Sequence, residues 1–386
     1  MSTLAKSFVS VAGLLLALGL LMVYSASITS RPTEFEEVYL SRQLLFVGVA
    51  LCASVSAVLT PTSFWRRSTW MLMGVVVVLL ALVLIPGLGV SVKGARRWLR
   101  LGGYSLQPSE LAKVVLPLVI CRISADGAWR RQAWWRSLLT MILPVSATVG
   151  LVVIEPDLGT ALFLVVMTGG ALYFSGWPLR RFVWLGLAVV PMLAGAVALR
   201  PYQLARVRGF LAAWQDFHLA PYQLRQSLTT LGSGGLFGAG LGQGQQKLSF
   251  LPEANTDFVF AVIGEELGLL GTVGVILLWG ALFGLGVRLL SQRLRGSFEH
   301  AAGMTLLCGL VLQAALNMAV VLALVPPKGI SLPLISYGGS SLVTSLLTIG
   351  IILSLSRGDS VVSDRSASAL GPSADFLAGS EAEVRD

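Results

Sequence analysis

The chain has 386 residues, of which 55% are apolar and only 12% are charged, and its mean hydropathy is +0.79. Soluble globular proteins carry about 25% charged residues, so this composition excludes an ordinary soluble domain and indicates a membrane protein. The 28 basic residues outnumber the 19 acidic ones, which gives a net charge of +9.

Apolar segments of about 20 residues, the length that crosses a bilayer as a helix, occur ten times. We predict an all-α polytopic membrane protein, because a span must satisfy its backbone hydrogen bonds internally and no alternating barrel pattern is present. The first segment also resembles a signal peptide, but its length favours an uncleaved span. The predicted spans are 8–28, 42–60, 69–86, 109–123, 137–154, 158–176, 182–199, 257–290, 301–325 and 339–356.

Basic residues concentrate in the short connections on one side of these spans, which indicates that this side is cytoplasmic. An even number of spans then places both termini in the cytoplasm. We predict that residues 1–357 form the transmembrane domain. Residues 358–386 are rich in small and acidic residues without apolar periodicity, which is typical of a disordered cytoplasmic tail.

Basic residues also occur on the opposite side, against the usual insertion bias. As a group they favour an anionic ligand on the outer face, such as a phosphate or a lipid headgroup. For any single one of them, contact with outer-leaflet headgroups is an equally good explanation. They are Lys93, Arg96, Arg97 and Arg100 in one loop, Arg200, Arg206, Arg208, Arg225 and Lys247 in a second, and Lys328 in a third.

The second of these loops, residues 200–256, is a large extracytoplasmic connection between the seventh and eighth spans. Its glycine-rich part, 232–244, would let backbone amides approach a phosphate or a sugar, although a flexible hinge explains the glycines as well. The three cysteines and two histidines have no disulfide or metal-ligand spacing. Any chemistry must therefore depend on carboxylates, basic groups and hydroxyls.

Two polar motifs lie at the outer ends of spans. In QPSELAKVV, 107–115, Glu110 and Lys113 are three residues apart and share one helix face, where they can pair as a structural ion pair or line a polar cavity. In EPDLGT, 155–160, Asp157 is placed to cap the following helix, and Glu155 could face the same cavity as Glu110.

The stretch PPKGISLPLISYGGSS, 326–341, cannot form a continuous helix, because prolines and glycines interrupt it. Irregular backbone at membrane depth is tolerated where it lies against protein or lines a watery cavity. We therefore expect a re-entrant, site-lining segment with Lys328 as its cation. Its hydrogen-bonding side chains are Ser331, Ser336, Tyr337, Ser340 and Ser341.

Asp257 lies where the long loop enters the eighth span, shielded in part from water but accessible from outside. Such a carboxylate can have a raised pKa and act as a general base; the alternative is a simple N-cap, since an apolar run follows. Glu265 and Glu266 lie two to three turns deeper, where a structural role facing the bundle interior is expected.

Together these motifs resemble the SEDS family of shape, elongation, division and sporulation proteins, which includes FtsW, RodA and SpoVE. Lys328 in its P-x-K-G pattern and Glu253-Ala254 ahead of T-D-F favour the division branch. The resembling stretches occur in the family's order across nearly the whole membrane region. They are RRWLRLGGYSLQPSELAK at 96–113, EPDLGT at 155–160, LGSGGLFGAGLGQGQQKLSFLPEANTDFVFAVIGEELG at 231–268 and PPKGISLPLISYGGSS at 326–341.

The resemblance implies a peptidoglycan glycosyltransferase that polymerises lipid II on the outer face of the bacterial cytoplasmic membrane during cell division. The implied partners are lipid II, the nascent glycan strand, a class B penicillin-binding protein and other division proteins, and no nucleic acid. The family's catalytic aspartate corresponds to Asp257. The residues implied or expected to bind substrate are Arg96, Arg97, Trp98, Glu110, Lys113, Lys328, Ser336, Tyr337 and Ser340.

In the implied reaction, Asp257 takes the proton from the acceptor's 4-hydroxyl as that oxygen attacks the donor's anomeric carbon. Undecaprenyl pyrophosphate leaves without a general acid. Arg96, Arg97, Lys328 or a divalent metal ion, Mg²⁺ or Mn²⁺, would neutralise the developing charge, and no organic cofactor is implied.

Two positions depart from the family pattern. Asn255 stands where many relatives have His, and Glu155 stands where Gln is common, which puts a neutral hydrogen-bonding role there in doubt. Two other functions remain open. A lipid II flippase would need charge along a path through the whole membrane, whereas the polar groups here crowd the outer half. A non-catalytic scaffold for a penicillin-binding protein would not explain a shielded carboxylate beside outer basic residues.

Overall fold

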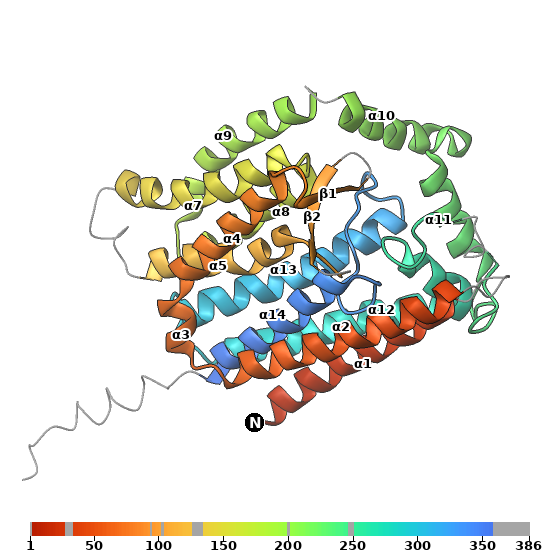
Figure 1. Cartoon of the computed structure of the whole chain (residues 1–386), viewed down its shortest axis with the longest axis horizontal. Coiled ribbons are helices and arrows are strands. Elements are labelled where there is room, and N and C mark those ends of the chain that lie inside the picture. The colour runs from red at the N-terminus through yellow and green to blue at the C-terminus, as the bar shows by residue number, and fades with distance from the viewer. Residues whose placement is uncertain are drawn as a thin grey trace, which may run out of the picture.

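The computed structural model describes residues 2–27, 34–92, 95–101, 104–125, 134–198, 201–245 and 251–357. A helix lies at each of the ten predicted spans, so the all-α polytopic architecture is confirmed (Figure 1). The predicted tail, 358–386, lies outside the described residues. The ten helices are α1 (Thr3–Ser27), α2 (Glu34–Leu59), α4 (Thr69–Leu84), α5 (Pro108–Ala125), α7 (Trp134–Ile154), α8 (Leu158–Phe174), α9 (Leu179–Ala198), α12 (Val259–Leu290), α13 (Phe298–Val321) and α14 (Gly339–Arg357).

Among the described residues, five of these helices are long and apolar enough to cross a membrane by length and composition, namely α1, α2, α12, α13 and α14. Three more, α4, α7 and α8, are apolar but shorter. Helix α5 carries Glu110, Lys113 and Arg122. It is buried along most of its length, so its outer charges lie against protein rather than lipid.

The helices run broadly side by side, with α5 and α13 in the interior and α9 along one edge (Figure 1). Close approach between neighbours depends on glycine. A side chain at Gly350 of α14 would collide with the backbone of Ser54 on α2, and one at Gly19 of α1 would collide with the backbone of Leu334. A short helix, α3 (Thr62–Arg67), connects α2 to α4.

Helix α12 is broken at Gly268, whose φ of 67° and ψ of −162° lie in a region that only glycine occupies readily. The predicted span 257–290 is therefore two segments, 259–267 and 269–290. The second segment alone is about 33 Å long at 1.5 Å per residue, which suffices to cross the hydrocarbon core. The first is an additional buried helix that enters the outer part of the bundle, and the side chains of 259–263 are all at most 1% exposed.

The long connection between α9 and α12, on the side predicted to be extracytoplasmic and called outer below, is largely helical in its described residues. It contains α10 (Pro201–Gln215), a 3-10 turn η1 (Phe217–Leu219) and α11 (Tyr222–Ser233), followed by glycine-rich turns up to residue 245. A second outer element is an antiparallel sheet of order β1-β2-β3, which the sequence did not predict. Its strands are β1 (Gly89–Val92), β2 (Ala95–Leu101) and β3 (Tyr104–Leu106). Both elements lie at the end of the bundle where the α13–α14 connection emerges (Figure 1).

Candidate functional site

Asp257 precedes α12 without capping it. The N-cap residue of α12 is Phe258, and no side chain accepts a capping hydrogen bond there. The Asp257 side chain is half-buried. Its Oδ2 lies against Gly329, because a Cβ built on that glycine would be only 3.2 Å from the oxygen. The carboxylate therefore has no helix-capping function and faces the α13–α14 connection, residues 322–338.

The backbone around Asp257 is fixed by side chains from two other elements. Asn317 of α13, 1% exposed, donates from Nδ2 to the Asp257 carbonyl at 2.8 Å and to the Ile330 carbonyl at 2.6 Å. The Ser336 hydroxyl donates to the Thr256 carbonyl at 2.5 Å. One amide side chain thus holds both sides of the contact between Asp257 and the α13–α14 connection.

Three hydroxyl residues predicted to bind substrate make contacts within the protein. Ser336 also accepts from the Leu332 amide at 2.8 Å, and the Tyr337 amide donates to the Asn255 carbonyl at 2.8 Å. Ser340 donates to the Ser105 carbonyl and accepts from the Gln107 amide, both at 3.1 Å. These contacts orient the 326–341 segment against the Asp257 turn and the sheet.

Lys328 extends over the start of α8. Its Cδ would be 3.7 Å from a Cβ at Gly159, so the side chain needs the space that this glycine leaves. Burial lowers the pKa of Lys328, and the nearby Asp157 carboxylate counteracts part of that effect. The ammonium group is therefore within range of the Asp157 charge, and the next residue in the chain, Gly329, contacts Asp257.

Asp157 caps α8, as its spacing predicts, by accepting from the Thr160 amide at 3.1 Å and the Thr160 hydroxyl at 2.9 Å. Its Oδ2 also lies 3.4 Å from Nη1 of Arg97, whose Nη2 donates to the Pro156 carbonyl at 3.0 Å. The register of β1 and β2 shifts between Val90 and Ser91, opposite Arg97. Bulges of this kind re-aim side chains, and here the side chain aimed at the turn is Arg97.

Glu155 is fully buried, and neither carboxyl oxygen has a hydrogen-bond partner among the described residues. Burial, reinforced by the charge of Asp157 and opposed by Arg97, raises the pKa of Glu155 to about 8. The side chain is thus mainly protonated at pH 7. A glutamic acid at this position can therefore act as a neutral group, as the family's usual glutamine does.

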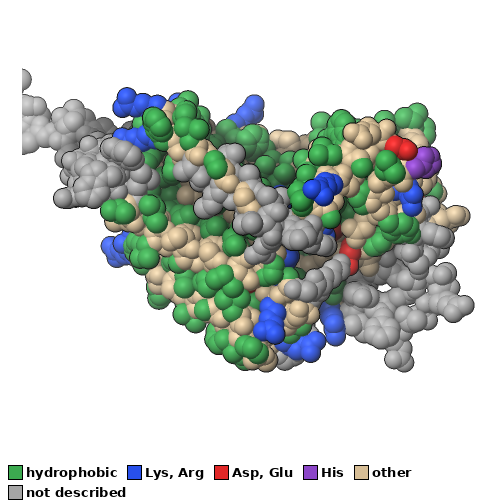
Figure 2. Space-filling model, turned by 90° about the horizontal axis from the view of Figure 1, so that it is seen from above, with side chains coloured by type: hydrophobic (Ala, Val, Ile, Leu, Met, Phe, Trp, Pro, Cys, Tyr) green, Lys and Arg blue, Asp and Glu red, His purple; other side chains and the backbone are tan. Residues whose placement is uncertain are grey.

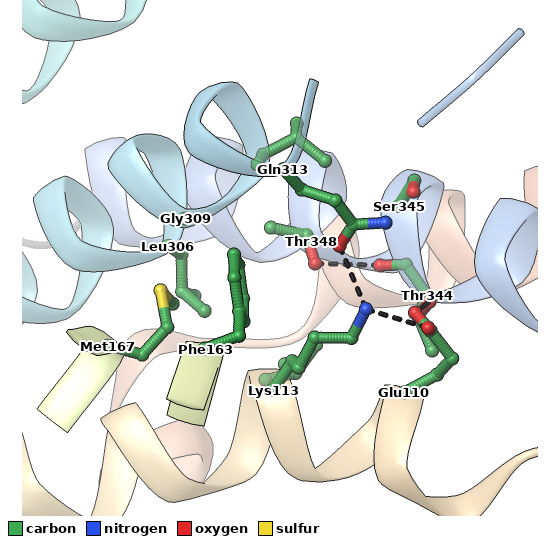
Figure 3. A pocket seen from close by; sticks show the side chains of 12 residues that line it. Glu110, Lys113, Phe163, Met167, Leu306, Gly309, Gln313, Thr344, Ser345 and Thr348 are labelled. Atoms are coloured by element: carbon green, nitrogen blue, oxygen red, sulfur yellow. Dashed lines mark hydrogen bonds and ion pairs between the residues drawn. The ribbon is translucent and has the colours of Figure 1, made fainter. Parts of the chain in front are cut away.

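Glu110 and Lys113 form the expected ion pair, with 2.6 Å between Oε1 and Nζ (Figure 3). Lys113 also donates to Gln313 Oε1 at 2.9 Å, and Gln313 Nε2 donates to the Ser331 carbonyl at 3.2 Å. The pair borders a small cavity of about 30 Å³, large enough for a water molecule. Gln313 links this polar pair to the α13–α14 connection.

The glycine-rich turns face protein carboxylates. The Gly242 amide donates to Glu266 Oε2 at 3.2 Å, the Gln245 amide donates to Glu265 Oε1 at 2.7 Å, and the Ser25 hydroxyl donates to Glu266 Oε2 at 2.5 Å. We call residues 234–245 with Glu265 and Glu266 the glycine latch. Of the glycine amides suggested for a phosphate or sugar, that of Gly242 donates to a buried carboxylate, and those of Gly238 and Gly240 donate to the Gly234 and Glu266 carbonyls. Glu265 and Glu266 have the structural role expected of them.

Five charged or ionisable side chains come together at the outer end of the bundle, and we call them the outer cluster: Arg97, Glu155, Asp157, Asp257 and Lys328. Figure 2, which views the α9 and α10 face, shows basic side chains around a hollow in which a carboxylate is visible. Of the other predicted site residues, Glu110 and Lys113 lie deeper on α5. Arg96 is exposed and Trp98 half-buried on the central strand of the sheet.

Sequence reasoning missed Gln313 and Asn317, which lie one helical turn apart on α13. The signal was present, because two amide side chains interrupt an otherwise apolar span at i and i+4, where burial of unpaired polar groups is costly.

The sequence is similar to known proteins over most of its length. Residues 5–360 match the profile of the FtsW, RodA and SpoVE family, described as a cell cycle protein. The chain is 36% identical over 350 residues to stage V sporulation protein E of Bacillus subtilis, which covers 89% of this chain and 94% of the relative. It is 39% identical to the probable peptidoglycan glycosyltransferase FtsW of Trichlorobacter lovleyi, with 89% and 91% covered.

Two solved structures have the same fold. A chain of the structure described as "Structural coordination of polymerization and crosslinking by a peptidoglycan synthase complex" has a TM-score of 0.74 and 28% identity, covering 91% of this chain and 96% of that one. The rod shape determining protein RodA of Thermus thermophilus has a TM-score of 0.65 and 29% identity, with 91% and 95% covered.

Proposed function

Because the chain belongs to the FtsW/RodA/SpoVE family of cell cycle proteins, we propose that it is a peptidoglycan glycosyltransferase that polymerises lipid II on the outer face of the bacterial cytoplasmic membrane during cell division. The assignment of the active site depends on the environment of Asp257. Asp257 is a half-buried carboxylate that caps no helix, contacts Gly329, the residue after Lys328, and has its backbone fixed by Asn317.

In the proposed reaction Asp257 acts as general base. It takes the proton of the acceptor's 4-hydroxyl while that oxygen forms a bond to the donor's anomeric carbon, and the bond from that carbon to the pyrophosphate oxygen breaks with inversion. Positioned proton transfer of this kind contributes about two to four orders of magnitude in rate. The hydrogen bonds from Asn317 and Ser336 support this role because they fix the backbone that carries the carboxylate.

The leaving pyrophosphate needs positive charge nearby, and the outer cluster supplies Lys328 and Arg97. The charge balance of the cluster depends on Glu155. With Glu155 protonated, two cations face two carboxylates; with Glu155 ionised, a third negative charge would repel the pyrophosphate. The raised pKa of Glu155 therefore favours binding of an anionic substrate at neutral pH.

A divalent cation, Mg²⁺ or Mn²⁺, would supply further neutralisation of the pyrophosphate. Among the described residues, no three His, Cys, Asp or Glu side chains are grouped to hold a metal. Asp157 is already engaged by Arg97 and Thr160. The residues do not fit a dedicated metal cage, so such an ion would be held chiefly by the substrate's phosphates. No step proposed here depends on it.

The proposed orientation in the membrane depends on the distribution of basic residues, and the proposed partner depends on the relatives. The basic connections support a cytoplasmic position for both termini; the outer cluster would then face outward, where lipid II would be used. A related chain belongs to a peptidoglycan synthase complex, which supports partnership with a class B penicillin-binding protein and, through it, with other division proteins.

The test uses purified protein in liposomes with labelled lipid II, comparing wild type with Asp257→Asn. We expect polymer from the wild type and a loss of at least about a hundredfold in the variant, because the amide cannot accept the proton. Glu253→Gln is the matched control, since Glu253 is an exposed carboxylate four residues away. It should polymerise at nearly the wild-type rate with the same melting temperature.

A flippase would behave differently in this experiment. Movement of labelled lipid II across the bilayer without polymer, equal in wild type and Asp257→Asn, would refute the enzymatic proposal. Neither polymer nor lipid movement from correctly folded protein would favour the scaffold.

A further inference from the structure

The glycine latch carries three exposed apolar side chains. Leu236 and Phe237 are 61% and 78% exposed, and Leu241 is 47% exposed. The loop that holds them, residues 234–242, contains only glycine, alanine, leucine and phenylalanine and has no charged side chain. Large apolar side chains grouped on a loop in water cost free energy. We call Leu236, Phe237 and Leu241 the latch tip.

The backbone of this loop is hydrogen-bonded to protein beside the latch tip. Non-helical backbone at membrane depth is tolerated only where protein or a watery cavity satisfies its polar groups. The latch meets this condition for the amides that follow Leu236 and Phe237. Each donor and its acceptor are Gly238 and the Gly234 carbonyl at 2.8 Å, Ala239 and the Glu265 carbonyl at 2.9 Å, Gly240 and the Glu266 carbonyl at 3.0 Å, and Gly242 and Glu266 Oε2 at 3.2 Å.

The latch tip lies at the outer end of the membrane span. The Leu269 amide donates to the Gly235 carbonyl at 2.9 Å, and the Leu270 amide donates to the Leu236 carbonyl at 3.3 Å. From Leu269 to Arg288, which is exposed near the opposite end, the helix is about 28 Å long at 1.5 Å per residue. The hydrocarbon core is about 30 Å thick, and arginine near a helix end extends to the polar interface. With Arg288 at the inner interface, the latch tip lies close to the outer edge of the hydrocarbon.

The latch tip also continues an apolar surface on α12. The exposed residues of this surface follow one another at helical spacing, so they form one stripe along the span, and in a membrane protein such a stripe faces lipid. The two hydrogen bonds from the start of the stripe place the latch directly beside it. The residues of the stripe are Leu269, Leu270, Val273, Ile276 and Leu277.

We propose that the latch tip inserts into the outer leaflet of the membrane, where its three side chains contact the acyl chains of the lipids. The connection predicted to be extracytoplasmic then enters the membrane at residues 234–242. The inference goes beyond the proposed function, because it concerns where the latch lies and not what Asp257 does. Since the latch also binds Glu265 and Glu266, lipid contact at its tip fixes the depth of the helix segment that leads to Asp257.

The experiment measures the depth of a nitroxide spin label attached at Phe237→Cys, in the full chain reconstituted into phosphatidylcholine liposomes. The exposed Cys52 is first replaced by alanine, and the signal of this parent protein is subtracted. Depth follows from collisions with oxygen, which is concentrated in lipid, and with a nickel chelate, which stays in water. We expect the label to collide with the chelate at least about tenfold less often than a label in water, and with oxygen as often as a label in lipid.

Two matched positions provide the reference values. Leu277→Cys lies deeper on the same exposed stripe and gives the value for lipid. Thr229→Cys, at an exposed polar position of α11, gives the value for water. All three side chains are exposed, so the label does not disturb the packed interior.

Two results would overturn the inference. Equal collision with the nickel chelate at positions 237 and 229 would mean that the latch tip lies in water. Infrequent collision with both reagents at position 237 would mean that protein, such as a second copy of the chain, covers the tip instead of lipid. Neither measurement uses lipid II, so a failure of the proposed glycosyltransferase activity would leave this result unaffected.

Discussion

The glycine latch and the outer cluster both place carboxylates near the outer end of the bundle, but each latch carboxylate accepts a hydrogen bond from a backbone amide, whereas Glu155 of the outer cluster accepts none from the described residues. In the latch, Glu265 and Glu266 are 4% and 0% exposed and accept hydrogen bonds from backbone amides and from Ser25. In the outer cluster, Asp257 is half-buried and Glu155 is buried with both oxygens unpaired within the described residues.

The contrast indicates a structural role for Glu265 and a chemical role for Asp257, although the two residues are only eight positions apart in the chain. A buried carboxylate with its hydrogen bonds satisfied fixes a structure, and one with a perturbed or open environment is available to react or to titrate. Substitutions in the latch should therefore lower stability, whereas substitutions around the outer cluster should change rate or pH dependence.

The largest effect is expected from Gly238→Ala in the latch. Gly238 has a φ of +79°, and a methyl group there would collide with the backbone of Glu266. Strain and overpacking together should cost about 3–5 kcal/mol, seen as loss of folded protein in thermal unfolding. Gly232→Ala is the control, because nothing lies within 4 Å of its added methyl group. Equal melting of the two variants would show that the latch does not hold the fold.

Glu266→Ala should come next, at about 2–3 kcal/mol of unfolding free energy. It leaves the Ser25 hydroxyl and the Gly242 amide without their buried acceptor. Glu266→Gln keeps one acceptor oxygen and should recover part of the loss. The rate per folded molecule should stay within about twofold of wild type. A large fall in that rate at normal stability would mean that the latch takes part in the chemistry.

The third effect concerns the amide clamp on the Asp257 backbone. Asn317→Leu should lower kcat per folded molecule about tenfold, because the carboxylate loses a fixed position. It should also cost about 1–3 kcal/mol of unfolding free energy, because the Asp257 and Ile330 carbonyls lose their donor. Gln313→Leu is the matched control on the same face of α13, since Gln313 contacts Lys113 and Ser331 and not Asp257. Equal losses in the two variants would contradict a specific role for Asn317.

The fourth effect is a pH dependence of stability that arises at Glu155. Its pKa is raised in the folded state to about 8, so the unfolded chain binds fewer protons between about pH 4.5 and 8, and stability falls as pH rises through that window. Glu155→Gln should remove this dependence. Its stability relative to wild type should grow steadily from pH 5 to 8 and level off above that range. If the difference in unfolding free energy between Glu155→Gln and wild type did not vary with pH, a neutral buried Glu155 would be contradicted.

Features set by local sequence could be predicted. The ten spans follow from hydropathy, the Asp157 cap follows from an acidic residue just before an apolar run, and the Glu110–Lys113 pair follows from i, i+3 spacing. The irregular 326–341 segment follows from its prolines and glycines. Each of these depends on neighbours within about one or two helical turns.

Features set by distant contacts could not be predicted. The strands at 89–106 are short and charged, so no apolar alternation marks them, and the bulge that separates Arg97 from Arg96 exists only in the pairing with β1. Nothing local distinguishes Gly268 from the other glycines of α12; its conformation is fixed by packing against Leu236 and Gly238. Likewise, the amides of the glycine-rich turns could donate to any anion. Only the tertiary structure shows that the Gly242 and Gln245 amides donate to Glu266 and Glu265.

The break at Gly268 affects how the protein responds to differences in bilayer thickness. Bilayers differ in thickness, and a continuous helix that is longer than the hydrocarbon core accommodates the difference by tilting. Such a tilt would move Asp257 as well. Here the spanning segment, 269–290, ends at a glycine joint, and the segment that leads to Asp257 is held by protein on all sides. The joint therefore allows the span to tilt without changing the height of the Asp257 carboxylate in the membrane.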